Sequence, residues 1–255
     1  ALIAAGKAAQ TARKASLFGI AGLSPNIDFQ SVHKHVHDVI ASIAPNDSIQ
    51  RYEGLGVNVI QEEGHFVDPR EVVAGNVRIR AKKFVVASGS SPRVPPIEGI
   101  NDVSYLTNET VFHLKEAPSH LIVVGGGPLG CELAQAYRRL GAKVTVLDEG
   151  TILSKEDPEL ATVVKKQLLE EGIEIKEHAK ITAAKQKNNS VIIVSSCSNQ
   201  AKPLEGSHLL IAAGRVPNLT GLDLEAGGIE YEQNGILTNK RLLTSNKRVY
   251  ALGDV

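Results

Sequence analysis

The chain has 255 residues, 42% of them hydrophobic, and its 28 Lys and Arg side chains balance 28 Asp and Glu, so the formal net charge is zero. This composition is typical of a globular protein with one large domain or two ordinary ones, and the lack of a basic excess argues against a general binder of nucleic acid or membrane surfaces. No apolar run approaches the roughly 18 residues of a membrane span, so we expect a cytoplasmic protein.

The first 52 residues have helical patterns. Residues 1–16 and 27–44 are predicted to be helices, and residues 45–48 end the second one and cap a further turn or two. His33 and His37 share one face of the second helix and could form half of a metal site. No Glu base lies between them and no third ligand is evident, so a solvated polar face is the better interpretation and we predict no metal.

Between residues 57 and 88 the pattern changes to short β runs. The runs form a small antiparallel ribbon with a turn at 74–76, and they end in an apolar strand. The predicted strands are 57–60, 64–67, 71–73, 77–80 and 83–87. Residues 88–96 break regular structure and begin a stiff linker, which predicts a domain boundary between Pro92 and Pro118.

A glycine-rich loop follows the apolar strand 121–124. Residues 125–130, which are Gly125, Gly126, Gly127, Pro128, Leu129 and Gly130, match the pattern G-x-G-x-x-G. In this pattern Gly125 permits a tight turn, Gly127 lets the backbone approach a pyrophosphate without a Cβ, and Gly130 lets the next helix pack close to the strand. The helix N-terminus offers free N–H groups to the same pyrophosphate. The loop therefore predicts a dinucleotide site.

An amphipathic helix and a second strand complete this unit. Gly141 is placed to end the helix, and the strand 143–147 leads to Asp148, 23 residues after Gly125. A carboxylate at that position can accept hydrogen bonds from an adenosine ribose and repels a 2′-phosphate, and no Arg follows before Glu156, so we predict NAD(H) rather than NADP(H). The apolar stripe of the helix is predicted to consist of Leu129, Leu133, Ala136 and Leu140.

The remaining sequence continues the alternation of strands and helices. Asp157 caps a helix that runs to residue 169 with Pro158 in its first turn. A strand at 172–175, a ribbon at 181–184 and 191–194 with its turn at 188–189, and a buried strand at 208–213 follow. These elements predict one α/β domain over about 117–241, after which residues 248–254 open another strand.

The two cysteines, Cys131 and Cys197, are 66 positions apart and have no C-x-x-C or zinc spacing. We expect Cys131 to be a small buried apolar group in the helix after the glycine loop, and we expect no function for Cys197. The sequence contains no Met, begins within a helical pattern and stops without a terminal element. These features suggest a fragment.

The order of these pieces resembles the class I pyridine nucleotide-disulfide oxidoreductases, flavoenzymes such as dihydrolipoamide dehydrogenase, glutathione reductase and mercuric reductase. Residues 87–92 resemble the A-T-G-x-x-P segment at the crossing between the flavin and nicotinamide domains, and residues 125–132 resemble the second dinucleotide fingerprint. Residues 213–218 resemble G-R-x-P-N, and residues 250–254 resemble the flavin motif Y-A-x-G-D. Within this family, the amino-acid sequence is most similar to those of mercuric reductases and dihydrolipoamide dehydrogenase.

The resemblance implies an α/β protein with two Rossmann-like domains, in which the NAD(P) domain is inserted into an incomplete FAD domain. Residues 1–116 would be the partial FAD-binding domain, 117–241 the NAD(P)-binding domain, and 242–255 the return strand of the FAD-binding domain. The implied cofactors are FAD and NAD.

The resemblance also implies roles for single residues. Glu132 would lie beside the nicotinamide, with an exposed helix face as the plainer alternative. Ile181 and Gly214 would contact NAD. Equally, Ile181 could be a core residue and Gly214 a turn residue. Asp254 would accept a hydrogen bond from a ribityl hydroxyl, with a strand-end cap as its alternative. The other implied FAD-binding residues are Gly64, Ala87, Ser88 and Gly89, and Glu62 departs from the glycine usual near the first of these.

No catalytic residue of the family is expected in this chain. The redox-active C-x-x-x-x-C should precede Ala1, and a dimerisation domain with a His-Glu pair should follow Val255, so we expect the chain alone to be inactive. The parent would be a homodimeric oxidoreductase that passes electrons between NAD(P)H, FAD and a cysteine pair, with a small-molecule substrate that is either a lipoamide-like disulfide or dithiol, or Hg(II). The alternative is an NAD-binding module or a flavin-only NADH oxidase without a disulfide centre.

Overall fold

The computed structural model describes residues 1–21, 24–188, 190–197 and 200–255, without the side chains of residues 196–197 and 200–202. The chain forms two compact units, each built from two segments. Unit 1 consists of residues 1–44 and 92–214, and unit 2 consists of residues 45–91 and 215–255. These units are defined by compactness and do not identify a cofactor, so the assignment of residues 1–116, 117–241 and 242–255 to cofactor domains stays a prediction.

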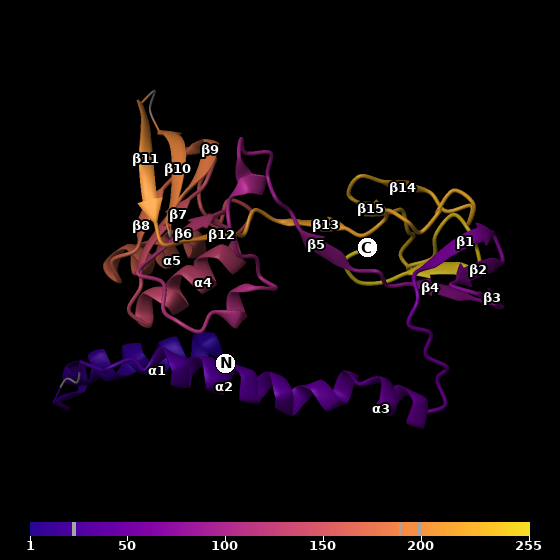
Figure 1. The fold of residues 1–255 in the computed structure, drawn as a ribbon, viewed down its shortest axis with the longest axis horizontal. Helices are drawn as coiled ribbons and strands as arrows, with labels where there is room; N and C mark the ends of the chain where they lie inside the picture. The colour runs from indigo at the N-terminus through magenta and orange to yellow at the C-terminus, as the bar shows by residue number, and fades with distance from the viewer. Residues whose placement is uncertain (22–23, 189, 198–199) are drawn as a thin grey trace. The chain divides into compact units, whose positions relative to one another are not determined.

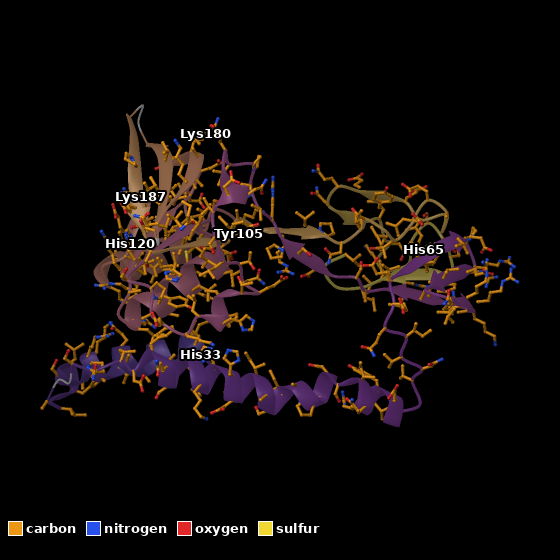
Figure 2. All side chains as sticks on the ribbon, viewed as in Figure 1. His33, His65, Tyr105, His120, Lys180 and Lys187 are labelled. Atoms are coloured by element: carbon orange, nitrogen blue, oxygen red, sulfur yellow. The ribbon has the colours of Figure 1, made fainter. Side chains whose placement is uncertain are left out.

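Unit 1 contains a four-stranded parallel sheet in the order β12-β6-β7-β8 (Figure 1). Its strands are β6 (His120–Val124), β7 (Lys143–Leu147), β8 (Glu174–Lys176) and β12 (His208–Ile211), joined in part by α4 (Pro128–Arg139) and α5 (Pro158–Glu170). This alternation confirms the predicted α/β class. His120, labelled in Figure 2, begins β6, and its Nε2 lies 2.9 Å from the hydroxyl of Thr145. The hydroxyl of Thr145, which is fully buried, also donates to Glu174 at 3.0 Å.

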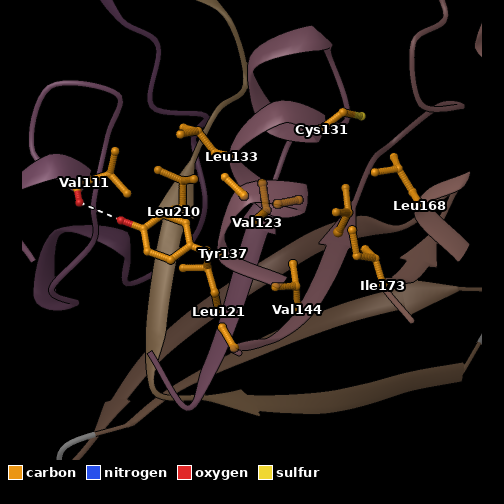
Figure 3. Close-up of a cluster of buried hydrophobic side chains, with 14 of the residues drawn as sticks. Val111, Leu121, Val123, Cys131, Leu133, Tyr137, Val144, Leu168, Ile173 and Leu210 are labelled. Atoms are coloured by element: carbon orange, nitrogen blue, oxygen red, sulfur yellow. Dashed lines mark hydrogen bonds between the residues drawn. The ribbon is translucent and has the colours of Figure 1, made fainter. Parts of the chain in front are cut away.

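One face of this sheet packs against α4 (Figure 3). Tyr137 of α4 is 1% exposed, and its hydroxyl donates to the Val111 carbonyl at 2.8 Å. The predicted stripe of α4 is buried at Leu133, Ala136 and Leu140, but the prediction was wrong for Leu129, which is 37% exposed. Leu129 lies in the first turn of the helix, at the glycine loop and beyond the end of the sheet, where the periodic pattern continues although the core does not.

The other face of the sheet is covered by an antiparallel ribbon in the order β11-β10-β9. Its strands are β9 (Lys180–Lys187), β10 (Ser190–Cys197) and β11 (Gln200–Gly206). Ile193 of the ribbon is fully buried in the same cluster as Ile122 and Leu147 of the sheet. The predicted two-stranded ribbon is confirmed and gains a third strand, whereas Asn189 of the predicted turn lies outside the described residues.

The N-terminal helices agree with the predicted ranges. They are α1 (Leu2–Arg13), η1 (Ala15–Phe18), α2 (Phe29–Ile43), η2 (Ala44–Asp47) and α3 (Ile49–Gly54), and two short turns, η3 (Ile100–Asp102) and η4 (Val111–His113), follow later. In unit 1, α1 packs closely on α4, because a Cβ on Gly6 would lie 3.3 Å from the Cα of Ala136. Asp28 caps α2 by accepting from the backbone N–H groups of Gln30 and Ser31.

None of the helices in the described part of the chain is long and apolar enough to cross a membrane.

Unit 2 contains α3 and a set of short strands. They are β1 (Gly64–Asp68), β2 (Glu71–Ala74) and β3 (Val77–Arg80) in one antiparallel sheet, and three pairs: β4 (Phe84–Val86) with β16 (Val249–Ala251), β5 (Ser90–Pro92) with β13 (Arg215–Pro217), and β14 (Tyr231–Glu232) with β15 (Gly235–Ile236). The predicted turn at 74–76 is confirmed, with Gly75 at φ 57°. Phe66 and Phe84 pack edge to face with ring centroids 5.6 Å apart, which joins the sheet to the β4/β16 pair.

Three local predictions in unit 2 were wrong. Residues 57–60 form no strand: Val57 is 48% exposed and this run pairs with none of the described strands. β4 does not end the antiparallel ribbon, because it pairs in parallel with β16. The predicted irregular linker 88–96 contains β5, whose partner β13 lies more than a hundred residues away in the sequence.

Candidate functional site

The glycine loop lies at the carboxyl end of β6, as the pattern predicts. Gly125 has φ 105°, and a Cβ there would lie 2.4 Å from the carbonyl oxygen of Ala212, just beyond β12. A Cβ on Gly130 would lie 2.0 Å from the carbonyl oxygen of Gly125. Real Cβ atoms do not approach backbone oxygens so closely, so both positions need glycine for the turn and for the contact between helix and loop.

Gly127 differs from these two glycines. Its φ is −70°, and no described atom lies within 4 Å of the Cβ position. The protein's own packing therefore does not require a glycine here. Gly127 is also the N-cap of α4, and no side chain among the described atoms caps this helix. Free N–H groups at an open helix N-terminus, in front of a residue without a Cβ, fit the pyrophosphate of a dinucleotide.

Asp148 follows β7 and is half-buried beside the loop. One carboxylate oxygen accepts from the N–H of Gly126 at 2.7 Å, and the other accepts from the N–H of Gly150 at 2.8 Å. The sequence pattern predicted an acid here but did not show that it would fasten the loop itself. Each carboxylate oxygen can accept a further hydrogen bond, so Asp148 can hold the loop and still accept from a ribose hydroxyl.

The other predicted NAD contacts lie in different surroundings. Pro128 and Leu129 are exposed in the first turn of α4, and Glu132 is exposed one turn later. Gly214 has φ 103°, and no described atom lies near its Cβ position. Ile181 is 7% exposed and belongs to the cluster between the sheet and the ribbon. The roles of these residues toward a nucleotide stay predictions.

Cys131 is a buried residue of α4, as predicted. It is 5% exposed, and its thiol donates to the carbonyl oxygen of Gly126 at 3.3 Å. Burial, with smaller contributions from Asp148 and Glu132, raises the pKa of the thiol to about 11. Such a thiol is not a thiolate nucleophile near neutral pH. The side chain of Cys197 lies outside the described part of the chain.

In unit 2 the parallel strands β4 and β16 end side by side, where Leu252 donates to the carbonyl of Val86 at 2.9 Å. Loops beyond the carboxyl ends of neighbouring parallel strands are the usual ligand positions in α/β proteins. The residues brought together in these loops include four of the five predicted for FAD: Ala87, Ser88, Gly89 and Asp254. The fifth, Gly64, begins β1.

Asn218 organises the loop after β4. Its side-chain amide donates to the Ser88 carbonyl at 3.0 Å and accepts from the Ser91 hydroxyl at 2.8 Å. Its backbone N–H donates to the carbonyl of Gly89 at 2.9 Å, and its own carbonyl accepts from the Ser88 hydroxyl at 2.8 Å. Asn218 belongs to the motif at residues 213–218, but no function was predicted for it from the sequence.

Arg215 connects the same loop to Asp254. Its Nε donates to the hydroxyl of Ser90 at 2.6 Å, a second nitrogen donates to the Ser90 carbonyl, and Nε lies 3.9 Å from a carboxylate oxygen of Asp254. Ser90 itself donates to that carboxylate at 3.3 Å. The Asp254 side chain is 73% exposed, so it is held in place while its acceptor sites stay open to a hydroxyl-bearing ligand.

The histidines of α2 interact with each other and with η4. The rings of His33 and His37 lie 4.2 Å apart between centroids, those of His37 and His113 lie 5.5 Å apart, and His37 Nε2 is 3.2 Å from the Phe112 carbonyl. Desolvation and the neighbouring charges of His37, Lys115 and His113 lower the pKa of His33, which is labelled in Figure 2. Among the described residues, no group of three or more His, Cys, Asp or Glu is arranged to hold a metal ion.

Comparison with known proteins places these features in one family. The family model for pyridine nucleotide-disulphide oxidoreductases matches residues 3–255. A mercuric reductase of Staphylococcus aureus is 33% identical over 230 residues, which are 89% of this chain and 42% of that protein. A dihydrolipoyl dehydrogenase of Geobacillus stearothermophilus is 29% identical over 262 residues, which cover all of this chain and 55% of that protein. The chain thus spans about half the length of the curated relatives it matches.

Solved structures agree with these matches. LpdA from Mycobacterium tuberculosis superimposes with a TM-score of 0.84 and 28% identity over 99% of this chain and 56% of that chain. The HOCl-induced flavoprotein disulfide reductase RclA from Escherichia coli superimposes with a TM-score of 0.71 and 30% identity over 77% of this chain and 45% of that chain.

Proposed function

This chain belongs to the pyridine nucleotide-disulphide oxidoreductase family, and from that premise we propose that it is the nucleotide-binding part of an oxidoreductase dependent on FAD and NAD(P)H. NAD binds at residues 125–130 with Asp148, and FAD binds at the loops after β4 and β16. The observation that carries the proposal is the open, uncapped helix N-terminus at Gly127, whose lack of a Cβ serves no contact among the described atoms.

The chain's own residues bind and orient the nucleotides. The N–H groups at the start of α4 donate to the pyrophosphate, and Asp148 accepts from the adenosine ribose, which favours NADH over NADPH. In unit 2, Asp254 accepts from a ribityl hydroxyl while Arg215 and Ser90 hold its carboxylate. FAD, when bound, supplies the chemistry that takes up the hydride of NAD(P)H and passes on its two electrons.

The parent protein transfers these electrons to a small molecule through a pair of redox-active cysteines. The similarity to a mercuric reductase and to a dihydrolipoyl dehydrogenase supports two substrate classes, Hg(II) and a lipoamide-like disulfide or dithiol. We expect a cytoplasmic homodimer. We expect no turnover by the 255-residue chain alone, because its two cysteines form no C-x-x-x-x-C pair and the thiol of Cys131 is buried with a raised pKa.

The first experiment measures NADH binding by the 255-residue chain and by two glycine variants. Gly127→Ala places a Cβ where the pyrophosphate would lie, and we expect it to raise the Kd for NADH about tenfold or more. Gly54→Ala is the matched control, because its new Cβ also meets no described atom. Equal NADH binding by all three proteins would contradict the assignment of the site.

The second experiment compares NADH with NADPH in the chain and in Asp148→Asn. We expect the parent to prefer NADH about tenfold or more, and the variant to lose most of this preference because a neutral amide no longer repels a 2′-phosphate. A parent that prefers NADPH would refute the role of Asp148.

Flavin distinguishes the proposal from its alternative. The full-length parent protein, as purified, should carry a yellow flavin whose absorbance bands persist after gel filtration; the parent is used because the 255-residue chain is predicted to hold only part of the FAD-binding domain. A protein that binds NADH but no flavin would support a bare NAD-binding module, and in a full-length parent a bound flavin without a redox-active cysteine pair would support a flavin-only NADH oxidase.

A further inference from the structure

The loop of residues 149–157, between β7 and α5, packs against Gly126 of the glycine loop. The N–H of Leu153 donates to the Gly126 carbonyl at 2.8 Å, and a Cβ on Gly126 would lie 2.4 Å from a methyl carbon of Ile152. The side chains of Ile152 and Leu153 are buried, with exposed fractions of 4% and 8%. Gly126 is therefore held on one side by Asp148 and on the other by this loop.

The loop adopts a conformation that it would not hold by itself. Leu153 has φ 55°, in the left-handed region that residues with a branched side chain rarely occupy. Such a backbone persists only where surrounding contacts determine it. One of the contacts on this loop is a hydrogen bond with the side chain of a residue outside it.

That residue is Glu177, which follows β8. One carboxylate oxygen accepts from the N–H of Ile152 at 3.1 Å, and the other pairs with the ammonium of Lys165 on α5 at 2.5 Å. The Glu177 side chain is 17% exposed. Burial by itself would raise the pKa of Glu177, but the hydrogen bonds from Lys165 and Ile152 lower it below the ordinary value, so the carboxylate is charged at neutral pH.

We propose that Glu177 is a positioning residue for dinucleotide binding. It touches no nucleotide; it holds Ile152 and Leu153, and these hold Gly126 in the conformation in which the neighbouring N–H groups point toward a pyrophosphate. A loop that begins with three consecutive glycines, 125–127, has more backbone freedom to lose on binding than one built from other residues, so fixing it in advance raises affinity. The proposal rests on the assignment of residues 125–130 as the NAD site.

The test uses two substitutions of Glu177 in the 255-residue chain. Glu177→Ala removes the acceptor of the Ile152 N–H, and we expect the Kd for NADH and for ADP-ribose to rise about tenfold, which corresponds to about 1.4 kcal/mol. Glu177→Gln keeps a carbonyl oxygen for that N–H, although its NH2 group then faces the Lys165 ammonium and the charge pair is lost. Its Kd should stay within about threefold of the parent.

Two control variants separate positioning from general stability. Glu170→Ala removes an exposed acid of the same helix as Lys165, one that lies 4.0 Å from Lys166, and it should leave the Kd unchanged. Tyr137→Phe removes a buried hydrogen bond of α4 away from the loop, so it lowers the melting temperature without touching Glu177. A purely structural role for Glu177 would make Glu177→Ala and Tyr137→Phe weaken NADH binding to the same small extent.

The outcomes distinguish this proposal from the assignment of the site. If the parent itself binds neither NADH nor ADP-ribose, the NAD site is wrong and the role of Glu177 is wrong with it. If the parent binds and folded Glu177→Ala binds equally well, only the positioning role is overturned. Should Glu177→Ala not fold, Glu177→Met decides, because it fills similar space without an acceptor for the Ile152 N–H: a Kd raised about tenfold supports the proposal, and an unchanged Kd overturns it.

Discussion

Gly130→Ala is the substitution whose effect the structure determines most sharply. The new Cβ would lie 2.0 Å from the carbonyl oxygen of Gly125 and 3.1 Å from its carbonyl carbon. Neither partner can rotate away, because both atoms belong to the backbone. Gly125 itself is fixed by φ 105°, by its N–H bond to the Leu147 carbonyl at 2.9 Å, and by its close approach to Ala212.

The clash translates into a shift of α4 and a loss of stability. A Cβ needs at least 3.0 Å from such an atom, so helix and loop must separate by about 1 Å. α4 carries Leu133, Ala134, Ala136 and Tyr137, all at most 2% exposed, so the shift disturbs the core. Overpacking of a core costs typically about 1–3 kcal/mol, and a backbone clash belongs at the upper end. For a chain of this size about 3 kcal/mol lowers Tm by roughly 6–12 °C.

Thermal unfolding followed by circular dichroism measures this loss. Gly127→Ala is the control three residues earlier, with an open Cβ position, and we expect its Tm to stay within about 2 °C of the parent. NADH binding should weaken in both variants, but stability should fall only in Gly130→Ala. A Tm of Gly130→Ala within about 2 °C of the parent would refute the geometry of the contact between helix and loop.

Three further predictions concern buried groups. Tyr137→Phe leaves the Val111 carbonyl without its partner and should cost about 1–2 kcal/mol in urea unfolding, whereas an unchanged midpoint would contradict the hydrogen bond. Burial by itself would raise the pKa of Glu171, but its contacts with Arg139 outweigh burial and lower this pKa in the folded chain. Because the folded pKa is lowered, the ion pair stabilises the fold fully above the ordinary carboxyl pKa of about 4.3. Its contribution is lost as the pH falls through the folded pKa. Tm measured against pH should therefore show a deficit for Glu171→Gln at neutral pH that vanishes in acid, and a constant deficit would exclude the ion pair. Cys131, with a pKa of about 11, should react with iodoacetamide at least about a hundredfold more slowly in the folded chain than in urea, measured by mass spectrometry of its peptide; equal rates would show an accessible thiol.

The elements that could be predicted from the sequence are those whose signals are local. The glycine loop, α4 and β7 were recognised because turn glycines, helix periodicity and a buried β run each act over a few residues. Gly141, predicted to end the helix, follows it with φ 105°, and Asp157 caps α5 through the N–H groups of Glu159 and Leu160. These features depend on backbone preferences and caps that neighbouring residues determine by themselves.

The elements that were missed depend on partners far away in the sequence. β4 has the same apolar composition whether it joins the ribbon beside it or pairs with β16, and only the tertiary fold selects the second. β5 contains two serines and a proline, with no strand signal, and it pairs with β13. Residues 57–60 show the converse, since an apolar run without a partner strand does not become a strand.

The same distinction applies to the candidate sites. The glycines and Asp148 were found from their spacing, because the chemistry requires those residues at those intervals. The bond from Gly126 to Asp148 and the support of the loop by Glu177 were not, since Glu177 lies 29 residues beyond Asp148 and carries no motif. Its only signal in the sequence is an acid soon after a strand, which is common on surfaces.

The two aspartates at the candidate sites differ in a way that decides which can be mutated cleanly. Both carboxylate oxygens of Asp148 accept backbone N–H groups, from Gly126 and Gly150, so its removal disturbs the loop as well as any contact with a ribose. The Asp254 side chain is 73% exposed and accepts only from Ser90 among the hydrogen bonds described, with Arg215 at 3.9 Å. An exposed acid with such partners contributes little to stability. Loss of flavin in Asp254→Ala at unchanged Tm would therefore report on binding alone. Even the isosteric Asp148→Asn keeps only one of the two acceptor oxygens, so its Kd has to be compared together with its Tm.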